Sequence, residues 1–247
     1  MKPFLFYPLL FLIIPLINLA QCRPATLAEN EAYNRVVSEL QKQFTTHTPK
    51  GNWKVFDEKH SMGHVEVTSE WGNFIHLCTD RYDLIMENND AATARSIAIK
   101  DTTKPIHSFY VPRDTLYQAN PNAIIENAKR MYSVSVEMNL GNYRLQDEEN
   151  ARLVDSWQRI SIEGSSMALT VKLKPDLKGA IGREETVVFI GNWNLKPIVN
   201  GKDIRFRPIF KKGGKLFENL VITINAPFDL AQEIISNINW QSITKTL

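Results

Sequence analysis

Hydrophobic and polar residues alternate along much of the stretch 159–225. The pattern is clearest where every second residue is apolar, at Met167, Leu169, Val171 and Leu173. A period of two is typical of antiparallel strands that bury one face and expose the other to water. We therefore expect five β-segments in this stretch, joined by turns, with one buried face and one wet face.

The same buried face is continued by later apolar residues, interrupted only at Gly191: Val187, Phe189, Trp193, Leu195, Ile204, Phe206, Phe210, Leu220, Ile222 and Ile224. The segment Lys212–Lys215 contains Gly213 and Gly214, and this pair predicts a hairpin turn.

Helical spacing of apolar residues marks both ends of the chain. Thr26 and Glu29 form a capping box at the start of a helix expected over Leu27–Phe44, and a final helix is expected over Pro227–Asn239. Two further helices are expected, one from Asn120-Pro121 to Met131 and one over Asp147–Trp157, whose first turn is acidic.

The remaining segments read as strands with turns between them: Trp53–Phe56, His64–Thr68, Phe74–Cys78, Tyr82–Met86, Ser96–Ile99, Ile106–Val111 and Val134–Leu140. The expected fold is therefore α+β, a largely antiparallel sheet with packed amphipathic helices. We expect a single domain over residues 22–247, and a division near residues 141–157 is the alternative.

The first 21 residues carry the features of a secretory signal peptide. Lys2 precedes an apolar core over Phe4–Ile17, and Ala20 offers a small residue for cleavage. The apolar run is short for a transmembrane helix, and Pro8 and Pro15 interrupt it. We therefore expect the domain to be exported rather than held by an uncleaved anchor.

Two fates are open for Cys22. The segment Leu19-Ala20-Gln21-Cys22 resembles the lipobox of bacterial lipoproteins, although that family favours a smaller residue than Gln21. The resemblance implies acylation of Cys22 and attachment to a membrane. In the alternative, cleavage after Ala20 leaves Cys22 to form a disulfide with Cys78.

Composition and charge narrow the class of protein. The chain is 43% hydrophobic and 23% charged, proportions that exclude a disordered protein. The net charge of +2 gives no support for nucleic-acid binding. The sequence also contains many asparagines and no Asn-x-Ser/Thr acceptor, which favours a bacterial envelope location, periplasmic or lipid-anchored, with secretion as the alternative.

Catalytic motifs are absent from the sequence. It contains no phosphate-binding loop, dinucleotide fingerprint, Gly-x-Ser-x-Gly elbow or His-Glu-x-x-His motif. His60 and His64 beside Asp57 and Glu58 suit a surface turn and strand better than a metal site. Cys78 and His76 suit a buried or disulfide-bonded cysteine better than a nucleophile with its base. We therefore expect neither a metal nor a cofactor.

A basic stripe is the candidate site. Between Lys196 and Lys215 the sequence holds seven basic residues and one acid. The residues assigned to anion or partner binding are Arg205, Arg207, Lys211, Lys212 and Lys215. Such a stripe attracts anionic lipid, acidic glycan or an acidic protein surface, although strand lysines and arginines also serve as a plain solvated face.

These observations favour an exported, non-catalytic binding protein that uses its β-rich C-terminal half. One alternative is an exported enzyme, hydrolase-like, with its site in the irregular region 53–112, because loops on a rigid scaffold often carry chemistry. Another alternative is a carrier of an apolar ligand. It requires a cavity lined by Phe189, Leu195, Phe206 and Ile222.

Overall fold

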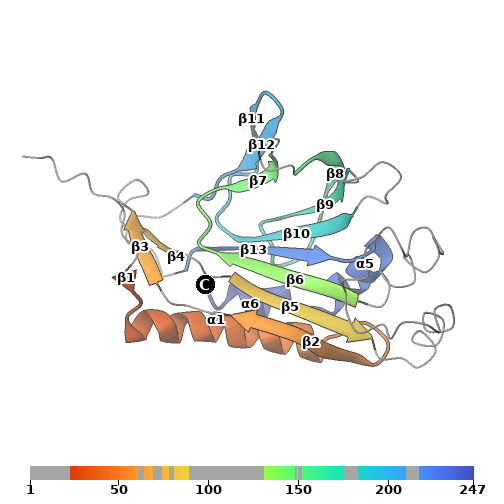
Figure 1. The fold of residues 1–247 in the computed structure, drawn as a ribbon, viewed down its shortest axis with the longest axis horizontal. Helices are drawn as coiled ribbons and strands as arrows, with labels where there is room; N and C mark the ends of the chain where they lie inside the picture. The colour runs from red at the N-terminus through yellow and green to blue at the C-terminus, as the bar shows by residue number, and fades with distance from the viewer. Residues whose placement is uncertain are drawn as a thin grey trace, which may run out of the picture.

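The computed structural model describes residues 23–60, 64–68, 74–77, 81–88, 131–147, 149, 152–174, 183–209 and 217–247. The fold is mixed and mostly β, with one large antiparallel sheet and a few helices (Figure 1). The large sheet has seven strands in the order β2 (Trp53–His60), β5 (Arg81–Asn88), β6 (Met131–Met138), β13 (Asn219–Asn225), β10 (Glu184–Gly191), β9 (Met167–Leu173) and β8 (Val154–Ile160).

Within the part of the chain that the structure describes, three helices cover one face of this sheet: α1 (Leu27–Thr46), α5 (Phe228–Asn237) and α6 (Trp240–Thr244). The predicted capping box of α1 is confirmed, because the backbone N–H of Thr26 donates to Glu29 and the N–H of Glu29 donates to the Thr26 hydroxyl. Alternate residues of the sheet and the apolar stripes of the helices form the larger core, where Phe44 of α1 meets Trp240 of α6 edge to face.

A second layer covers part of the opposite face. The strands β11 (Ile198–Asn200), β12 (Asp203–Phe206) and β7 (Tyr143–Gln146) form a three-stranded sheet that projects from the molecule at the top of Figure 1. Tyr143, Leu145 and Phe206 of this small sheet pack on the large sheet in a second core, where Phe206 lies 5.6 Å from Phe189 between ring centroids. The stretch 159–225, which the sequence predicts as one sheet, thus contributes strands to two sheets.

The second core corrects the expectation of a half-wet sheet. Every residue from Glu185 to Ile190 of β10 is buried, and so are Asn219 to Ile222 of β13. These strands lie between the helices on one side and the small sheet on the other, so both of their faces are dry. The predicted alternation holds better in β9, where Thr170 is half-buried and Lys172 is exposed.

The residues expected to line the cavity of an apolar-ligand carrier do not lie together in the structure. Phe189 and Phe206 pack together in the second core, whereas Ile222 faces the helices in the first core. Leu195 is exposed beyond the end of β10. The four side chains therefore lie in three different surroundings and do not line one cavity.

One helical expectation is wrong, and the expected end of another is also wrong. Residues 154–157 belong to strand β8, and Asp147 pairs with Arg152 in an isolated β-bridge, so the helix expected over Asp147–Trp157 does not form there. Met131 starts strand β6 rather than ending a helix, while the rest of the helix expected from Asn120-Pro121 lies outside the described residues. Trp157 packs against Phe206, and this tertiary contact outweighs the weak local preference for a helix.

Other strands follow the sequence more closely. The strands β3 (His64–Thr68) and β4 (Phe74–Leu77) pair in a further three-stranded sheet with the two-residue strand β1 (Arg23–Pro24). Both fall where the sequence predicts strands. The strands expected over Ser96–Ile99 and Ile106–Val111, and the hairpin turn Lys212–Lys215, lie outside the described residues. Within the described residues, no helix is long and apolar enough to cross a membrane.

Candidate functional site

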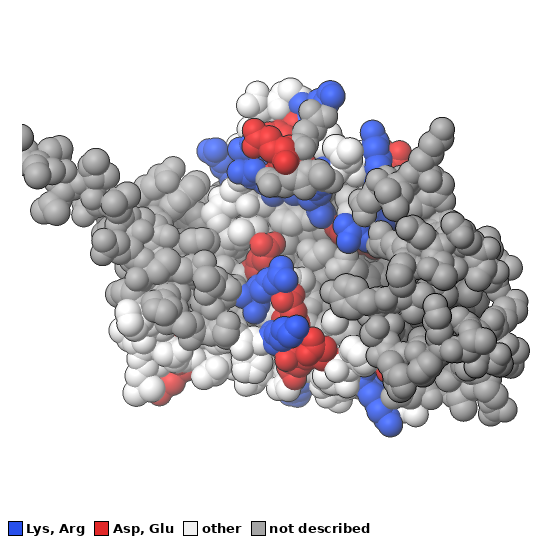
Figure 2. Space-filling model, in the orientation of Figure 1, with Lys and Arg blue, Asp and Glu red and all other residues white. Residues whose placement is uncertain are grey.

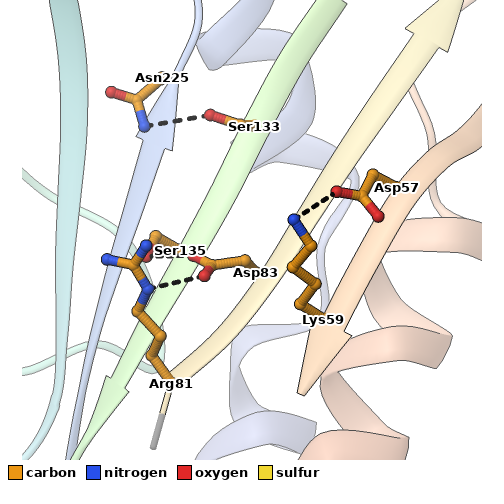
Figure 3. A network of polar contacts seen from close by, with 7 residues as sticks. All are labelled: Asp57, Lys59, Arg81, Asp83, Ser133, Ser135 and Asn225. Carbon is orange, nitrogen blue, oxygen red and sulfur yellow. Dashed lines mark hydrogen bonds and ion pairs between the residues drawn. The ribbon is translucent and has the colours of Figure 1, made fainter. Parts of the chain in front are cut away.

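The small sheet leaves the face of β2, β5 and β6 opposite the helices, together with the end of β13 at Asn225, uncovered by any described strand or helix, and this open face carries polar side chains (Figure 3). Strand pairing aligns them in rows across the sheet. Lys59 lies opposite Asp83, and Asp83 lies opposite Ser135. This row places a cationic, an anionic and a hydroxyl group within reach of one another.

The polar groups of the open face neutralise one another. Arg81 contacts Asp83 at 2.6 Å, and the hydroxyl of Ser135 donates to the other carboxylate oxygen of Asp83 at 2.7 Å. On β2, Lys59 lies 3.1 Å from Asp57. Figure 2 shows the result as a stripe of interleaved acidic and basic side chains across the middle of this face. A surface in which opposite charges alternate has no strong preference for an anion or a cation.

Glu137 differs from its neighbours on this face. It lies opposite Arg81 in the pairing of β5 with β6, yet it forms no hydrogen bond or ion pair with the residues that the structure describes. Burial raises the pKa of the Glu137 carboxyl, while the positive charges of Arg81 and Arg152 act in the opposite direction. Folding therefore disfavours the charged form of this group.

A buried ion pair joins the open face to the second core. Arg152 donates to Glu185 at 2.7 Å and to the hydroxyl of Tyr143 at 2.9 Å, and Glu185 is only 5% exposed. Burial raises the pKa of the Tyr143 hydroxyl. No sealed side-chain atom of this cluster lacks a hydrogen-bond partner, so its role is to hold the segment before β8 and the small sheet against β10.

The predicted basic stripe lies partly on the small sheet. Arg205 is half-buried in β12 and donates to Asp203 at 2.9 Å, so a neighbouring acid offsets its charge. Arg207 follows β12 and is exposed. Lys211, Lys212 and Lys215 lie outside the described residues. Arg144 of β7, opposite Arg205, also has an acid beside it, because it contacts Asp147 at 2.6 Å.

The hairpin of β11 and β12, with its flanks over residues 193–209, exposes apolar side chains next to these basic residues. The exposed fraction is 63% for Val199, 56% for Ile209, 47% for Leu195 and 41% for Ile198. The same residues 193–209 contain four basic residues and one acid. We call this segment, residues 193–209, the projecting hairpin.

Sequence reasoning found the charge of the projecting hairpin but missed its exposed apolar tip. The signal for the hairpin is Gly201, which with Lys202 forms the two-residue turn between the paired residues Asn200 and Asp203. Gly201 has a φ of 59°, as the first central residue of such a turn requires. Reading the turn correctly would have placed Ile198 and Val199 at the end of a short strand, where no further layer covers them.

The other sequence candidates do not gather into one site. His60 packs its ring against Tyr82 at 6.5 Å between centroids, while His64 lies in a different sheet. Asp57 is paired with Lys59, and Glu58 accepts a hydrogen bond from Gln41. Among the described residues, no three His, Cys, Asp or Glu side chains converge on a point where a metal ion could bind.

The two cysteines considered for lipid attachment, for a disulfide and for a nucleophile are not among the described residues. Cys22 and Cys78 lie outside the described residues, and His76 is described only as part of strand β4. No protein-family model matches the chain, and no curated protein or solved structure matches it either.

Proposed function

We propose that the protein is an exported, non-catalytic binding protein that docks on anionic phospholipid membranes through its projecting hairpin. The observation that carries this proposal is the exposure of Ile198 and Val199 on a segment whose basic residues outnumber its acids by four to one. Basic groups are attracted to anionic headgroups, and exposed aliphatic side chains gain free energy on entering the boundary of the acyl chains.

A membrane suits this surface better than the other anionic partners considered. The exposed apolar residues of the hairpin are aliphatic, whereas an acidic glycan has no aliphatic surface that would bury them. An acidic protein partner would have to match a narrow ridge, because the hairpin projects from the molecule (Figure 1). A bilayer accepts a ridge of any outline, since its headgroups rearrange around it.

The expected affinity is modest and fits a second attachment. Each basic residue near an anionic membrane contributes about 1 kcal/mol, so a net charge of three gives about 3 kcal/mol before the apolar tip is added. A single acyl chain also gives only marginal binding, and stable attachment requires two signals. In this proposal an acylated Cys22 supplies one signal and the projecting hairpin the other.

The experiment is co-sedimentation of the mature protein with vesicles of phosphatidylglycerol and phosphatidylcholine. Cys22→Ser is present throughout, so that the hairpin is the sole anchor under test. The variant Lys196→Gln/Lys202→Gln/Arg207→Gln is expected to bind phosphatidylglycerol vesicles at least about tenfold more weakly. The tip variant Ile198→Ser/Val199→Ser tests the apolar contribution separately.

The matched control is Lys42→Gln/Lys54→Gln/Lys174→Gln, which removes the same charge from three exposed lysines on other elements. This control is expected to bind within about twofold of the wild type. Equal losses in both triple variants would mean that overall charge, rather than the hairpin, controls association. Unchanged binding in the hairpin variants would refute the proposal.

A further inference from the structure

A groove of about 270 Å³ lies at the β8 edge of the large sheet, and its lining comes from β8, β9, β10 and the start of α5. It shares no residue with the projecting hairpin. Strand pairing places Gln158 opposite Thr170 and Thr170 opposite Thr186, and their neighbours Ser156, Lys172 and Glu184 form the next row. Phe228, at the start of α5, lies on the rim of the groove.

The middle of the groove is neutral and rich in hydrogen-bonding groups. Gln158, Thr170 and Thr186 offer one amide and two hydroxyls, and each of these groups both donates and accepts. The charged residues Lys172 and Glu184 are exposed and of opposite sign. One oxygen of Glu184 already accepts the backbone N–H of Phe228 at 2.8 Å. The groove therefore favours an uncharged ligand over an anion or a cation.

Thr186 supplies the second observation. Its side chain is among the most buried polar groups of the sheet, at 2% exposed, yet it forms no side-chain hydrogen bond with the residues that the structure describes. Its hydroxyl is not among the sealed side-chain atoms of the described residues that lack a partner, so it opens into the groove that Thr186 lines. Water or a ligand that occupies the groove therefore supplies its hydrogen bond.

The aromatic residue on the rim completes the site. Phe228 is 43% exposed, although a phenylalanine at the start of a helix can pack against the adjacent sheet. Its ring presents an apolar surface beside a floor of hydroxyl and amide groups. A sugar ring has this combination of surfaces, with C–H groups on one face and hydroxyls around its edge.

We infer that this groove binds a small neutral saccharide, with Thr186, Thr170 and Gln158 bonding its hydroxyls and Phe228 packing on its ring. The groove is smaller than the 300–1,000 Å³ typical of larger ligands, so one or two sugar units fit. A ligand of this size held by so few groups binds with a dissociation constant on the order of millimolar.

The test is a titration of the ¹⁵N-labelled mature protein with N-acetyl-D-glucosamine and with D-glucose, followed by amide chemical shifts. A saturable shift at Thr170, Lys172 and Thr186 with at least one of the two sugars is the expected result. Glycine, a zwitterion, serves as the control ligand, because Lys172 and Glu184 could in principle hold its two charges. The same amides shifting with glycine as with the sugars would overturn the inference, and so would shifts with neither sugar.

Two variants make the assignment specific. Thr186→Val keeps the shape of the side chain and removes only its hydroxyl, so it is expected to weaken sugar binding at least about fivefold while the protein stays folded. Phe228→Ala removes the ring and is expected to weaken binding similarly. Wild-type affinity in Thr186→Val would contradict the inference, because the hydroxyl would then have no part in holding the ligand.

Discussion

The guanidinium of Arg205 lies 2.9 Å from the carboxylate of Asp203, two residues earlier on the same strand. Successive side chains of a strand point to opposite faces, so these two side chains, two residues apart, lie on the same face of the small sheet. One of the positive charges of the projecting hairpin is thus offset within the hairpin itself. The negative charge of Asp203 therefore weakens the attraction of the projecting hairpin for anions.

Removing that acid is therefore expected to strengthen membrane binding. Asp203→Asn adds one unit of positive charge, and at about 1 kcal/mol per charge it should raise the partition onto phosphatidylglycerol vesicles about three- to fivefold. The loss of a partly exposed ion pair costs at most about 1 kcal/mol of stability. Co-sedimentation at low salt measures the gain.

The control for this variant is Asp155→Asn, the same change at an exposed position of β8. It should leave binding unchanged. If Asp203→Asn binds no better than the wild type, or if both variants gain equally, then the local charge of the hairpin does not set the affinity.

Two threonine-to-valine substitutions should have opposite consequences for stability. The hydroxyl of Thr244 contacts the carbonyl oxygens of Gly164 at 2.7 Å and Trp240 at 3.0 Å, so Thr244→Val is expected to lower the free energy of unfolding by about 1 kcal/mol. The hydroxyl of Thr186 has no such partner among the described residues, so Thr186→Val should leave stability unchanged or raise it slightly. Urea denaturation of both variants provides the comparison. A loss of 1 kcal/mol or more in Thr186→Val would show that its hydroxyl is satisfied within the fold.

Glu137 should make stability depend on pH. Because burial raises its pKa in the folded protein above the ordinary value of 4.5, the folded state holds this proton more tightly than the unfolded chain does. The stability that this proton contributes is complete below pH 4.5 and is lost as the pH rises through the folded-state pKa.

The variant Glu137→Gln cannot lose that proton. It should match the wild type in acid and become more stable than the wild type as the pH approaches 7. Urea midpoints measured for both proteins across this range test the prediction. A difference that stays constant with pH, or one that favours the wild type at neutral pH, would contradict it.

Gly191 and Gly201 should respond very differently to alanine. Both have positive φ angles, 94° and 59°, but a Cβ atom on Gly191 would overlap the backbone oxygen of Glu218, whereas one on Gly201 would meet nothing within 4 Å. Gly191→Ala is therefore expected to cost about 3 kcal/mol or more, and Gly201→Ala about 1 kcal/mol. Thermal or urea unfolding measures both. Similar costs would mean that β10 and β13 can separate to admit the extra atom.

The contrast between those two glycines also shows what the sequence can predict. Alternation of apolar residues located β9, β10 and β13, and Gly191, where the alternation is interrupted, is the last residue of β10. The alternation could not show that a second layer would cover β10, because a strand buried on both faces and a strand buried on one face differ only in what lies above them. That layer comes from Tyr143, Leu145 and Phe206, which are distant in sequence from β10.

The candidate surfaces divide in the same way. The basic residues of the projecting hairpin can be counted from the sequence alone, because the number of charges does not depend on the fold. The pairing of Arg205 with Asp203 and the exposure of Val199 depend on which residues share a face of a short strand. The groove at Thr186 could not be predicted at all, because its residues come from three strands and the start of a helix that only the completed sheet brings together.

The measurement that tests the proposed function most directly is the partition of the mature Cys22→Ser protein onto vesicles as salt is increased. Binding to phosphatidylglycerol vesicles should be clear at low salt and fall steeply as screening increases, while phosphatidylcholine vesicles bind far less protein throughout. Equal binding to the two lipids, or binding to phosphatidylglycerol that salt does not reduce, would contradict the proposal that the projecting hairpin docks on anionic membranes.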